Sequence, residues 1–553
     1  MFHLATCGHT TRNIMASNFF VSSAMKGGST KLVSATIHKC FVKSSSIGPS
    51  VDDPFHGMYN SAIVRNFHQT LNLSGLISRD HVRAFEEIFA QDKSTHKKGG
   101  EVLYSPDSID LAFNADWTGQ YRGSSELVLR PRTTQQVSKI VQYCNENNIA
   151  IVPQGGNTGL VGAGVPVDPT IEPRPQVIIS TNLMNEIISF NERSGTLVCQ
   201  SGCILEQLNL FLNEKGYQMP LDLAAKGSCQ IGGNIATGAG GIRFIRFGSL
   251  HSNLLGLECV LPDGSIMDNI KEIRKDNTGY HLSHLLVGSE GTLGIITKVS
   301  LQVAIKPKSV NVALIAVDSF EKIQQLIYMA KKELGEILSA VEFVDKDSMK
   351  LVMKHHKDTL GAPPVEGEYP FYMVIETQGS SREHDEEKLN MFFAKALEEG
   401  VASDGSLAFD EKQYYYLWKF RELVSESLKK DGYVYKYDIS IPLSKMYDIV
   451  LDMKERMKIF PQAKVFSFGH LGDENLHLNI TSPTFDQKIK DTIEPYVYEW
   501  TSKHRGSVSA EHGIGMLKKK YLHYSQCDVS INLMKSLKKT LDPKNIMNPH
   551  KIL

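Results

Sequence analysis

The sequence Pro153-Gln154-Gly155-Gly156-Asn157-Thr158-Gly159-Leu160 determines how the rest of the chain is interpreted. It follows an apolar run at 150–152, which predicts a buried strand that ends where the glycines begin. Glycine permits a positive φ and a close approach of the backbone to a ligand. Successive N–H groups in such a loop suit a pyrophosphate. The spacing is not G-x-G-x-x-G and no long helix follows at once, so an ordinary dinucleotide-binding turn is disfavoured. For this stretch alone, a plain surface turn is the alternative.

Two further small-residue segments follow, GSCQIGGNIATGAGG at 227–241 and GSEGTLGI at 288–295. We expect the first to be a loop, because it is too rich in small residues for a packed helix and too long for a simple turn. The first two loops, about seventy positions apart, indicate two sides of one long, flat ligand, and the third segment closes the region. Between the second and third segments, Pro262-Asp263-Gly264 predicts a hairpin turn.

Strands and helices are expected to alternate around these segments. The pattern predicts strands near 127–129, 177–180, 187–190 and 196–200, and helices near 134–144 and 205–214. The first strand, the first helix and the strand at 150–152 form a βαβ-like unit. After 306 charged amphipathic helices dominate, for example at 320–334, so a second domain is predicted to begin there. The charged segment 380–410 is expected to be a solvated helix with its connecting loop.

Composition excludes several classes of protein. The 553 residues carry a net charge of −1, which gives no whole-chain argument for nucleic acid or an acidic membrane surface. No apolar run reaches about 18 residues, so no transmembrane helix is predicted. The eight cysteines are scattered, and Cys199 and Cys203 lack a second pair at zinc-site spacing, so buried reduced thiols are expected.

The first 51 residues differ from the rest of the chain. They contain no Asp or Glu before Asp52, are rich in Ser and Thr, and hold five basic residues, Arg12, Lys26, Lys31, Lys39 and Lys43. This composition predicts a mitochondrial presequence and a matrix location. A disordered basic tail and a plastid address are the alternatives.

A polar cluster stands near the C-terminus. In 476–480 apolar residues alternate with His477 and Asn479, which puts these two on one face of a strand. A turn at 472–475 could fold His470 back beside His477, and Glu511-His512 offers an adjacent acid and imidazole. Two histidines and one carboxylate form the ligand set of a catalytic divalent metal. Histidines in strands are more often structural, so spacing alone leaves both interpretations open.

Six motifs together resemble the vanillyl-alcohol-oxidase-type flavoproteins, and within them the D-2-hydroxy acid dehydrogenases. They are PQGGNTGL, GSCQIGGNIATGAGG, GSEGTLGI, GHLGDENLHLN, SAEHGIG and LDPKNIMNP. The resemblance runs from about 70 to the end and implies an α+β fold with a two-subdomain FAD-binding domain and an α+β substrate cap with an antiparallel sheet. The implied division is 1–51 presequence, 52–119 N-terminal helical segment, 120–305 FAD-binding domain, 306–500 cap, and 501–553 returning to the flavin.

The same resemblance implies which residues hold the FAD. They are Pro153 to Leu160 as quoted above, with Gly227, Ser228, Gly232, Gly233, Asn234, Thr237, Gly240, Gly291, Ile295 and Asn548. Relatives that attach flavin through this loop commonly carry histidine after the Gly-Gly pair. Asn157 stands there in this chain, so the FAD is expected to be noncovalent.

It also implies the metal and substrate residues. His470, His477 and Glu511 match metal ligands, with zinc expected, while Arg421, Ser425, Lys436, Asn479 and His512 match substrate-binding residues. Glu474 replaces a small residue in the turn between the histidines, where it could alter metal choice or face solvent. His512 is the expected catalytic base.

The expected reaction is metal-assisted oxidation of D-2-hydroxyglutarate to 2-oxoglutarate, with hydride passing to flavin N5. Two cations, Arg421 and Lys436, suit a 2-hydroxy dicarboxylate better than lactate. Electrons would pass to a mitochondrial acceptor such as electron-transfer flavoprotein. The alternatives are a D-lactate or other D-2-hydroxy acid dehydrogenase, and a non-redox transferase on the same FAD fold. Oligomeric state is left open, a homodimer included.

Overall fold

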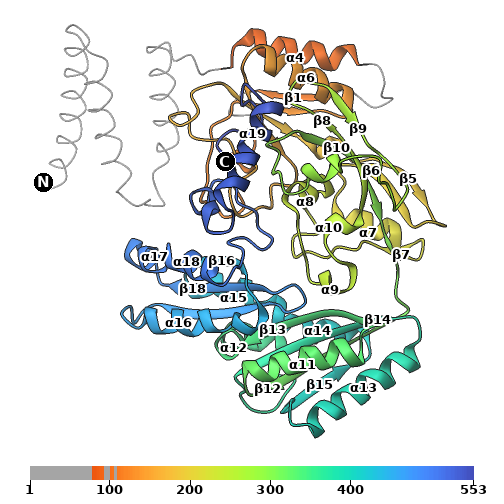
Figure 1. The fold of residues 1–553 in the computed structure, drawn as a ribbon, viewed down its shortest axis with the longest axis vertical. Coiled ribbons are helices and arrows are strands. Elements are labelled where there is room, and N and C mark those ends of the chain that lie inside the picture. The colour runs from red at the N-terminus through yellow and green to blue at the C-terminus, as the bar shows by residue number, and fades with distance from the viewer. Residues whose placement is uncertain (1–76, 93–99, 105–108) are drawn as a thin grey trace, which may run out of the picture. The chain divides into compact units, whose positions relative to one another are not determined.

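The structure is a computed structural model that describes residues 77–92, 100–104 and 109–553 (Figure 1). The predicted presequence at 1–51 lies outside the described residues. The first described helix, α4 (Arg79–Gln91), begins at Ser78 because the Ser78 side chain accepts a hydrogen bond from the His81 N–H at 3.2 Å.

The first sheet has the order β1-β2-β4-β3. Its strands are β1 (Glu101–Tyr104), β2 (Leu127–Arg130), β3 (Ala150–Gln154) and β4 (Gln176–Ser180). Strands β2 and β3 both run parallel to β4, which lies between them, and α6 (Thr134–Glu146) connects β2 to β3. The predicted βαβ-like unit is therefore present. The short helix α5 (Leu111–Asn114) lies between β1 and β2 in sequence, and η1 (Thr181–Leu183) follows β4.

The second sheet is antiparallel, with the order β5-β6-β10-β8-β9. Its strands are β5 (Ile187–Asn191), β6 (Thr196–Gln200), β8 (Leu254–Val260), β9 (Ile266–Asp268) and β10 (Ile295–Gln302). Strands β7 (Tyr217–Gln218) and β11 (Ala304–Ile305) form a separate pair. The helices of this part are α7 (Leu205–Asn213), α8 (Ile231–Thr237), α9 (Phe244–Phe247), α10 (Leu250–Asn253) and η2 (Leu282–Leu285).

The prediction of a loop throughout 227–241 is wrong, because residues 231–237 form helix α8. A Cβ at Gly232 would lie 2.4 Å from Cβ of Ser201. The small residue therefore lets this helix pack directly on the turn after β6, while Ile231 and Ile235 supply its buried apolar side. Close packing makes a helix from a sequence whose propensity opposes one.

The third sheet is a seven-stranded antiparallel sheet of order β15-β12-β14-β13-β17-β18-β16. Its strands are β12 (Ser309–Val317), β13 (Leu338–Asp345), β14 (Phe371–Gly379), β15 (Asp404–Ala408), β16 (Tyr433–Ser440), β17 (Lys464–His470) and β18 (Asn475–Ser482). The segment 380–410 contains helix α13 (Arg382–Glu398), as predicted, but the predicted connecting loop includes edge strand β15. Its sequence, DGSLA, lacks the alternation that would have indicated a strand.

Helices cover both faces of this sheet (Figure 1). One core holds α11 (Phe320–Glu333), α13 (Arg382–Glu398), α16 (Asp448–Met457), α17 (Gln487–Ile493) and α18 (Tyr496–Lys503). The other face packs against α12 (Lys346–Leu360), α14 (Glu411–Glu422) and α15 (Val424–Asp431). The remaining helices are η3 (Leu443–Lys445), η4 (Lys519–Tyr524) and α19 (Asp528–Leu541). The alternating apolar pattern of the strands thus fills two cores, one on each face.

Two expectations from composition concern the described residues. In that part of the chain no helix is long and apolar enough to cross a membrane. Five cysteines there are free and buried, as predicted: Cys144, Cys199, Cys203, Cys229 and Cys259. Cys527 is free but exposed.

Candidate active site

The strand register gathers polar side chains on one face of β13, β17, β18 and β16. Directly paired residues of antiparallel strands point to the same face. Three rows share this face: Glu342 with His470, Phe468 with His477 and Asp438, and Phe466 with Asn479 and Lys436. The predicted turn at 472–475 does fold His470 back beside His477.

The three predicted metal-ligand side chains converge. The Nε2 atoms of His470 and His477 lie 3.2 Å apart, and each lies 3.8 Å from Oε1 of Glu511. Two ligand atoms bound about 2.0–2.1 Å from a tetrahedral zinc lie about 3.3 Å apart. The donor set therefore fits one small divalent cation with a fourth position left for another ligand.

Glu342 fixes the orientation of His470. Its Oε1 lies 2.6 Å from His470 Nδ1, so an Nδ1–H bonded to the carboxylate leaves the Nε2 lone pair facing Glu511. The other oxygen, Oε2, accepts a hydrogen bond from Arg421 Nε at 2.8 Å. The Arg421 guanidinium also lies 4.5 Å from the centre of the Phe468 ring. One buried carboxylate thus positions both a predicted ligand and a predicted substrate-binding cation.

Asp438 lies beside the cluster. Together with His477, Glu511 and His512 it forms a second set whose possible ligand atoms all lie within 4.8 Å of one another. Its oxygens are already engaged, since Oδ2 accepts the N–H groups of Glu511 and His512 and Oδ1 accepts from Asn475. It faces Nδ1 of His477 at 3.8 Å and Nδ1 of His512 at 3.7 Å. We therefore assign it an orienting role and keep His470 in the donor set.

The electrostatics of the cluster favour a positive charge between its carboxylates. Burial opposes a charge on His470, but Glu342 and Glu511 outweigh it and raise the His470 pKa to about 10. Burial and then the His470 charge lower the pKa of His477 well below its usual value. Although burial acts in the opposite direction, the hydrogen bond and charge of His470 lower the Glu511 pKa to about 2. A divalent cation supplies the charge that these groups favour.

The other predicted substrate residues differ in their placement. His512 stacks on His477 with ring centres 5.9 Å apart, and the Asn479 amide donates to the His477 carbonyl at 3.1 Å. Lys436 lies in the Asn479 row, and burial lowers its pKa. Ser425, at the start of α15, is exposed, and no described contact joins it to the cluster. Glu474 is also exposed, which supports the solvent-facing alternative for that residue.

The three glycine-rich segments meet, although residues 161–226 separate the first from the second in sequence. A Cβ on Gly156 would lie 2.1 Å from the Ser228 carbonyl oxygen, and one on Gly155 would lie 3.8 Å from Cα of Gly233. The third segment joins the second where the Glu290 N–H donates to the Ala236 carbonyl at 2.8 Å. These contacts place the three segments close enough together to line one ligand site, as expected.

The C-terminal segment returns to these loops at Asn548. Its side-chain amide donates to the carbonyls of Ala163 and Glu290, at 2.9 and 2.7 Å. Asp542 fixes this return, because its two oxygens accept the N–H groups of Ile546 and Met547. Asn548 therefore links the residues just after the first glycine-rich segment to the third segment.

Several predicted cofactor residues border open space or carry an unpaired polar atom, as the binding site of a large polar ligand requires. A Cβ on Gly159 or Gly233 would meet no described atom within 4 Å, and the buried Oδ1 atoms of Asn234 and Asn548 have no described partner. Gly291 lies against Pro153, Gly240 lies beside Glu511, and Ile295 starts β10. Gly227 and Ser228 are exposed, Thr158 and Leu160 are half-buried, and Thr237 bonds within α8. These features fit FAD.

Two residues of the opening stretch have structural bonds of their own. The Gln154 amide donates to the carbonyls of Phe113 and Gly164, which closes the loop. The Asn157 amide donates to the carbonyls of Ala112 and Ala115, at 3.0 and 2.7 Å. Asn157 also has a φ of 50°, which asparagine tolerates better than most residues.

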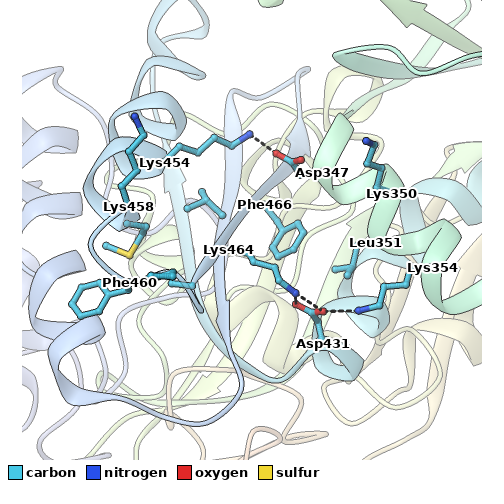
Figure 2. Close-up of a pocket in the computed structure, with 14 residues that line it drawn as sticks. Asp347, Lys350, Leu351, Lys354, Asp431, Lys454, Lys458, Phe460, Lys464 and Phe466 are labelled. Atoms are coloured by element: carbon cyan, nitrogen blue, oxygen red, sulfur yellow. Dashed lines mark hydrogen bonds and ion pairs between the residues drawn. The ribbon is translucent and has the colours of Figure 1, made fainter.

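A separate hollow of about 480 Å³ lies at the other end of β17 and contains none of the predicted site residues. Figure 2 shows Lys354 and Lys464 directed at Asp431, and Lys454 at Asp347. Its other lysines also have acidic partners, Glu368 for Lys350 and Glu455 for Lys458. We call this group the lysine hollow. Each of these lysines contacts a carboxylate, and Lys354 and Lys464 share one, Asp431.

Sequence reasoning missed Glu342, Asp438 and Glu290. A charged residue inside the apolar run LSAVEFVD was a signal for Glu342, and Asp438 alternates with Lys436 along its strand. Neither pattern indicates which histidine or loop the carboxylate would meet. That information comes from pairing across distant strands.

The chain matches family models over most of the described part. Residues 125–269 match the FAD binding domain, and residues 306–552 match the C-terminal domain of the FAD linked oxidases. A D-2-hydroxyglutarate dehydrogenase of Arabidopsis thaliana, described as mitochondrial, is 50% identical over 480 residues, covering 87% of this chain and 82% of the relative. A putative mitochondrial D-lactate dehydrogenase of Schizosaccharomyces pombe is 48% identical, covering 86% and 90%.

A solved structure of alkyldihydroxyacetonephosphate synthase has the same fold. It superposes with a TM-score of 0.66 at 19% identity, covering 86% of each chain. At this identity the likeness concerns the fold alone.

Proposed function

The chain belongs to the FAD-linked oxidases, and on that premise we propose that it oxidises D-2-hydroxyglutarate to 2-oxoglutarate. One observation carries the choice of substrate class. His470 and His477 share their sheet face with Lys436, the loop residues Glu511 and His512 lie against these histidines, and Arg421 adjoins them through Glu342, so two cations flank the donor set. Two carboxylates of a hydroxy diacid complement two cations.

The FAD is proposed to lie along the three glycine-rich segments and Asn548, held without a covalent link. When bound, FAD supplies the two-electron acceptor for a hydride from the substrate. The Asn157 side chain is an amide engaged with two carbonyls, and an amide is not a nucleophile. Acid precipitation tests this: a colourless pellet is expected, and a yellow pellet would contradict noncovalent binding.

The metal is proposed to be zinc, held by His470, His477 and Glu511. When bound, it would act as a Lewis acid that favours the ionised form of the substrate hydroxyl. Two features of the chain prepare the donor atoms. Glu342 fixes His470 so that Nε2 is the free atom, and the sheet register fixes His477 beside it. The donor chemistry, two imidazoles and a carboxylate, supports the proposal.

His512 is proposed to be the base that takes the hydroxyl proton at Nε2. Its Nδ1 faces the Asp438 carboxylate, so the Nδ1–H tautomer is favoured and the Nε2 lone pair remains free. Arg421 and Lys436 are proposed to hold the substrate carboxylates, with Asn479 and Ser425 as polar neighbours. The burial of Arg421 and Asn479 next to the cluster would exclude water from the reacting carbon.

The cellular setting is proposed from the relatives and from the composition of residues 1–51. Relatives described as mitochondrial support a mitochondrial location, and we propose the matrix. Electrons are proposed to pass to a carrier such as electron-transfer flavoprotein. The oligomeric state is left open, a homodimer included.

A D-lactate dehydrogenase is the second candidate, because one relative carries that name. Anaerobic mixing of the holoenzyme with D-2-hydroxyglutarate, L-2-hydroxyglutarate or D-lactate separates the candidates. We expect D-2-hydroxyglutarate to bleach the flavin fastest at equal concentration. Faster bleaching by D-lactate would overturn the substrate proposal. No bleaching by any 2-hydroxy acid would favour the non-redox transferase.

A further inference from the structure

The loop Glu511–Gly515 has no helical or strand structure, yet two buried carboxylates hold its backbone from opposite ends. Oδ2 of Asp438, on β16, accepts the N–H groups of Glu511 and His512 at 3.1 and 2.9 Å. Oε1 and Oε2 of Glu290, in the third glycine-rich segment, accept the N–H groups of Ile514 and Gly515 at 2.6 and 2.8 Å. Four of its five N–H groups are therefore bonded to carboxylate.

Both carboxylates are shielded from water and share one positive neighbour. Asp438 is 1% exposed and Glu290 is 5% exposed. Lys518, itself 2% exposed, donates to the Asp438 carbonyl at 3.1 Å, and its charge acts on both carboxylates. Bonds from N–H groups to a desolvated carboxylate are stronger than bonds between neutral groups. The arrangement is a built feature of the interior and not a surface contact.

Glycine at 513 and 515 is required by this path. A Cβ at Gly513 would lie 2.7 Å from Oε1 of Glu290, and one at Gly515 would lie 2.2 Å from the Val161 carbonyl oxygen. Both residues also have positive φ, 85° and 48°. The chain passes close to Glu290 and to the opening glycine-rich loop only because neither position carries a side chain.

We propose that Asp438 and Glu290 are positioning residues that act as a two-carboxylate clamp on this loop. The clamp sets Glu511 and His512 at a fixed place relative to the glycine-rich segments, because one carboxylate comes from the β16 sheet and the other from the flavin-binding part. Its catalytic meaning rests on the proposed function. Neither carboxylate needs to touch the substrate.

The two ends of the clamp respond differently to amide substitution. Each oxygen of Glu290 accepts a different N–H, so Glu290→Gln must direct its NH₂ group at one of them. Both N–H groups at the other end go to one oxygen of Asp438. Asp438→Asn can keep them if its NH₂ takes the place of Oδ1 and the Asn475 amide turns over, so that the Asn475 Oδ1, which has no described partner, accepts in place of the Nδ2 that now donates. Asp438→Ala removes both hydrogen bonds.

Hydrogen exchange read by mass spectrometry on the FAD-loaded full chain, without substrate, tests the clamp. Glu290→Gln should speed exchange in peptides covering 513–516 by about tenfold or more, and Asp438→Ala in those covering 510–513. Asp438→Asn should keep protection. Glu290→Asp keeps two acceptors and should recover part of it. The matched control is Asp542→Asn, a buried carboxylate that also accepts two successive N–H groups, whose exchange should change only near 543–548.

The kinetic arm measures the anaerobic rate of flavin reduction. In Glu290→Gln the limiting rate should fall about 10–100-fold, with KM changed less than about threefold, because the loop is displaced rather than the substrate cations. Unchanged exchange at 510–516, or the same increase in Asp542→Asn, would overturn the clamp. A wild-type enzyme that oxidises no 2-hydroxy acid would defeat the proposed function and leave the exchange result standing.

Discussion

The two ends of strand β17 both gather charged side chains, and they do so in opposite ways. At the start of the strand, Lys464 has a side chain 55% exposed and shares Asp431 with Lys354. At its end, His470 has a side chain 8% exposed and faces Glu342, His477 and Glu511. The lysine hollow has the more exposed charges, and the histidine end has the convergent lone pairs.

The difference shows that density of charge does not by itself make a site. In the lysine hollow every lysine contacts a carboxylate, Lys354 and Lys464 sharing Asp431, and the lysine side chains face water, which screens their attraction for a ligand. At the histidine end the donors are desolvated and aimed at one point, where a cation would satisfy all of them. Substitutions at the histidine end should therefore have large effects, and those in the lysine hollow should have small ones.

His512→Ala should nearly abolish turnover while FAD stays bound. Loss of a positioned base costs about 10²–10⁴-fold in rate, and no described contact joins the His512 ring to the glycine-rich segments. Steady-state kinetics with an artificial acceptor and the flavin absorbance of the purified variant check this. Turnover within about tenfold of wild type would remove His512 from the role of base.

Glu342→Gln should lower metal affinity or activity about 10–100-fold, because the amide cannot hold the His470 tautomer as the carboxylate does. Metal content measured after dialysis, together with kcat, reports both effects. Asp347→Asn, in the lysine hollow, is the matched control and should leave metal content unchanged. Full metal retention in Glu342→Gln with normal kcat would show that the orienting bond is dispensable.

Lys436→Met should raise KM for D-2-hydroxyglutarate about tenfold or more, because a charge-assisted bond of about 1.5–3 kcal/mol is lost. Any activity on D-lactate, which has one carboxylate, should change much less. Substrate saturation curves for both acids decide the matter. An equal loss of activity on both substrates would mean that Lys436 does not bind the second carboxylate.

Lys464→Ala should change kcat and KM by less than about twofold and the free energy of unfolding by less than about 1 kcal/mol, since its ion pair with Asp431 is solvent-exposed on the lysine side. Thermal unfolding and steady-state kinetics measure both. A kinetic effect of about tenfold would show that the lysine hollow takes part in the reaction, and the contrast between the two ends would fail.

The sequence predicts those parts of the site whose residues are close along the chain. Strand alternation in 476–480 placed His477 and Asn479 on one face, and a tight turn brought His470 beside them, because these relations are local. Glu342 lies 128 positions before His470, and Glu290 lies 224 positions before Ile514 in the loop that it holds. Only the pairing of distant strands and the long-range folding of the chain bring such residues together, and no local sequence pattern predicts these contacts.

The misread helix α8 has a related cause. Its glycines oppose a helix in isolation, but Gly232 allows contact with Ser201, and tertiary packing outweighs propensity. The edge strand β15 was missed because it pairs on one side only and shows no alternation. Ser425 remains a prediction, since its exposed side chain approaches the cluster through no described contact.

A catalytic metal at His470, His477 and Glu511 is best tested by anaerobic flavin reduction with D-2-hydroxyglutarate before chelation, after chelation and after zinc is returned. We expect fast reduction in the first state, a loss of about 100-fold or more in the second with FAD retained, and recovery in the third. Undiminished reduction in fully demetallated enzyme would contradict a catalytic role for a metal held by these three residues.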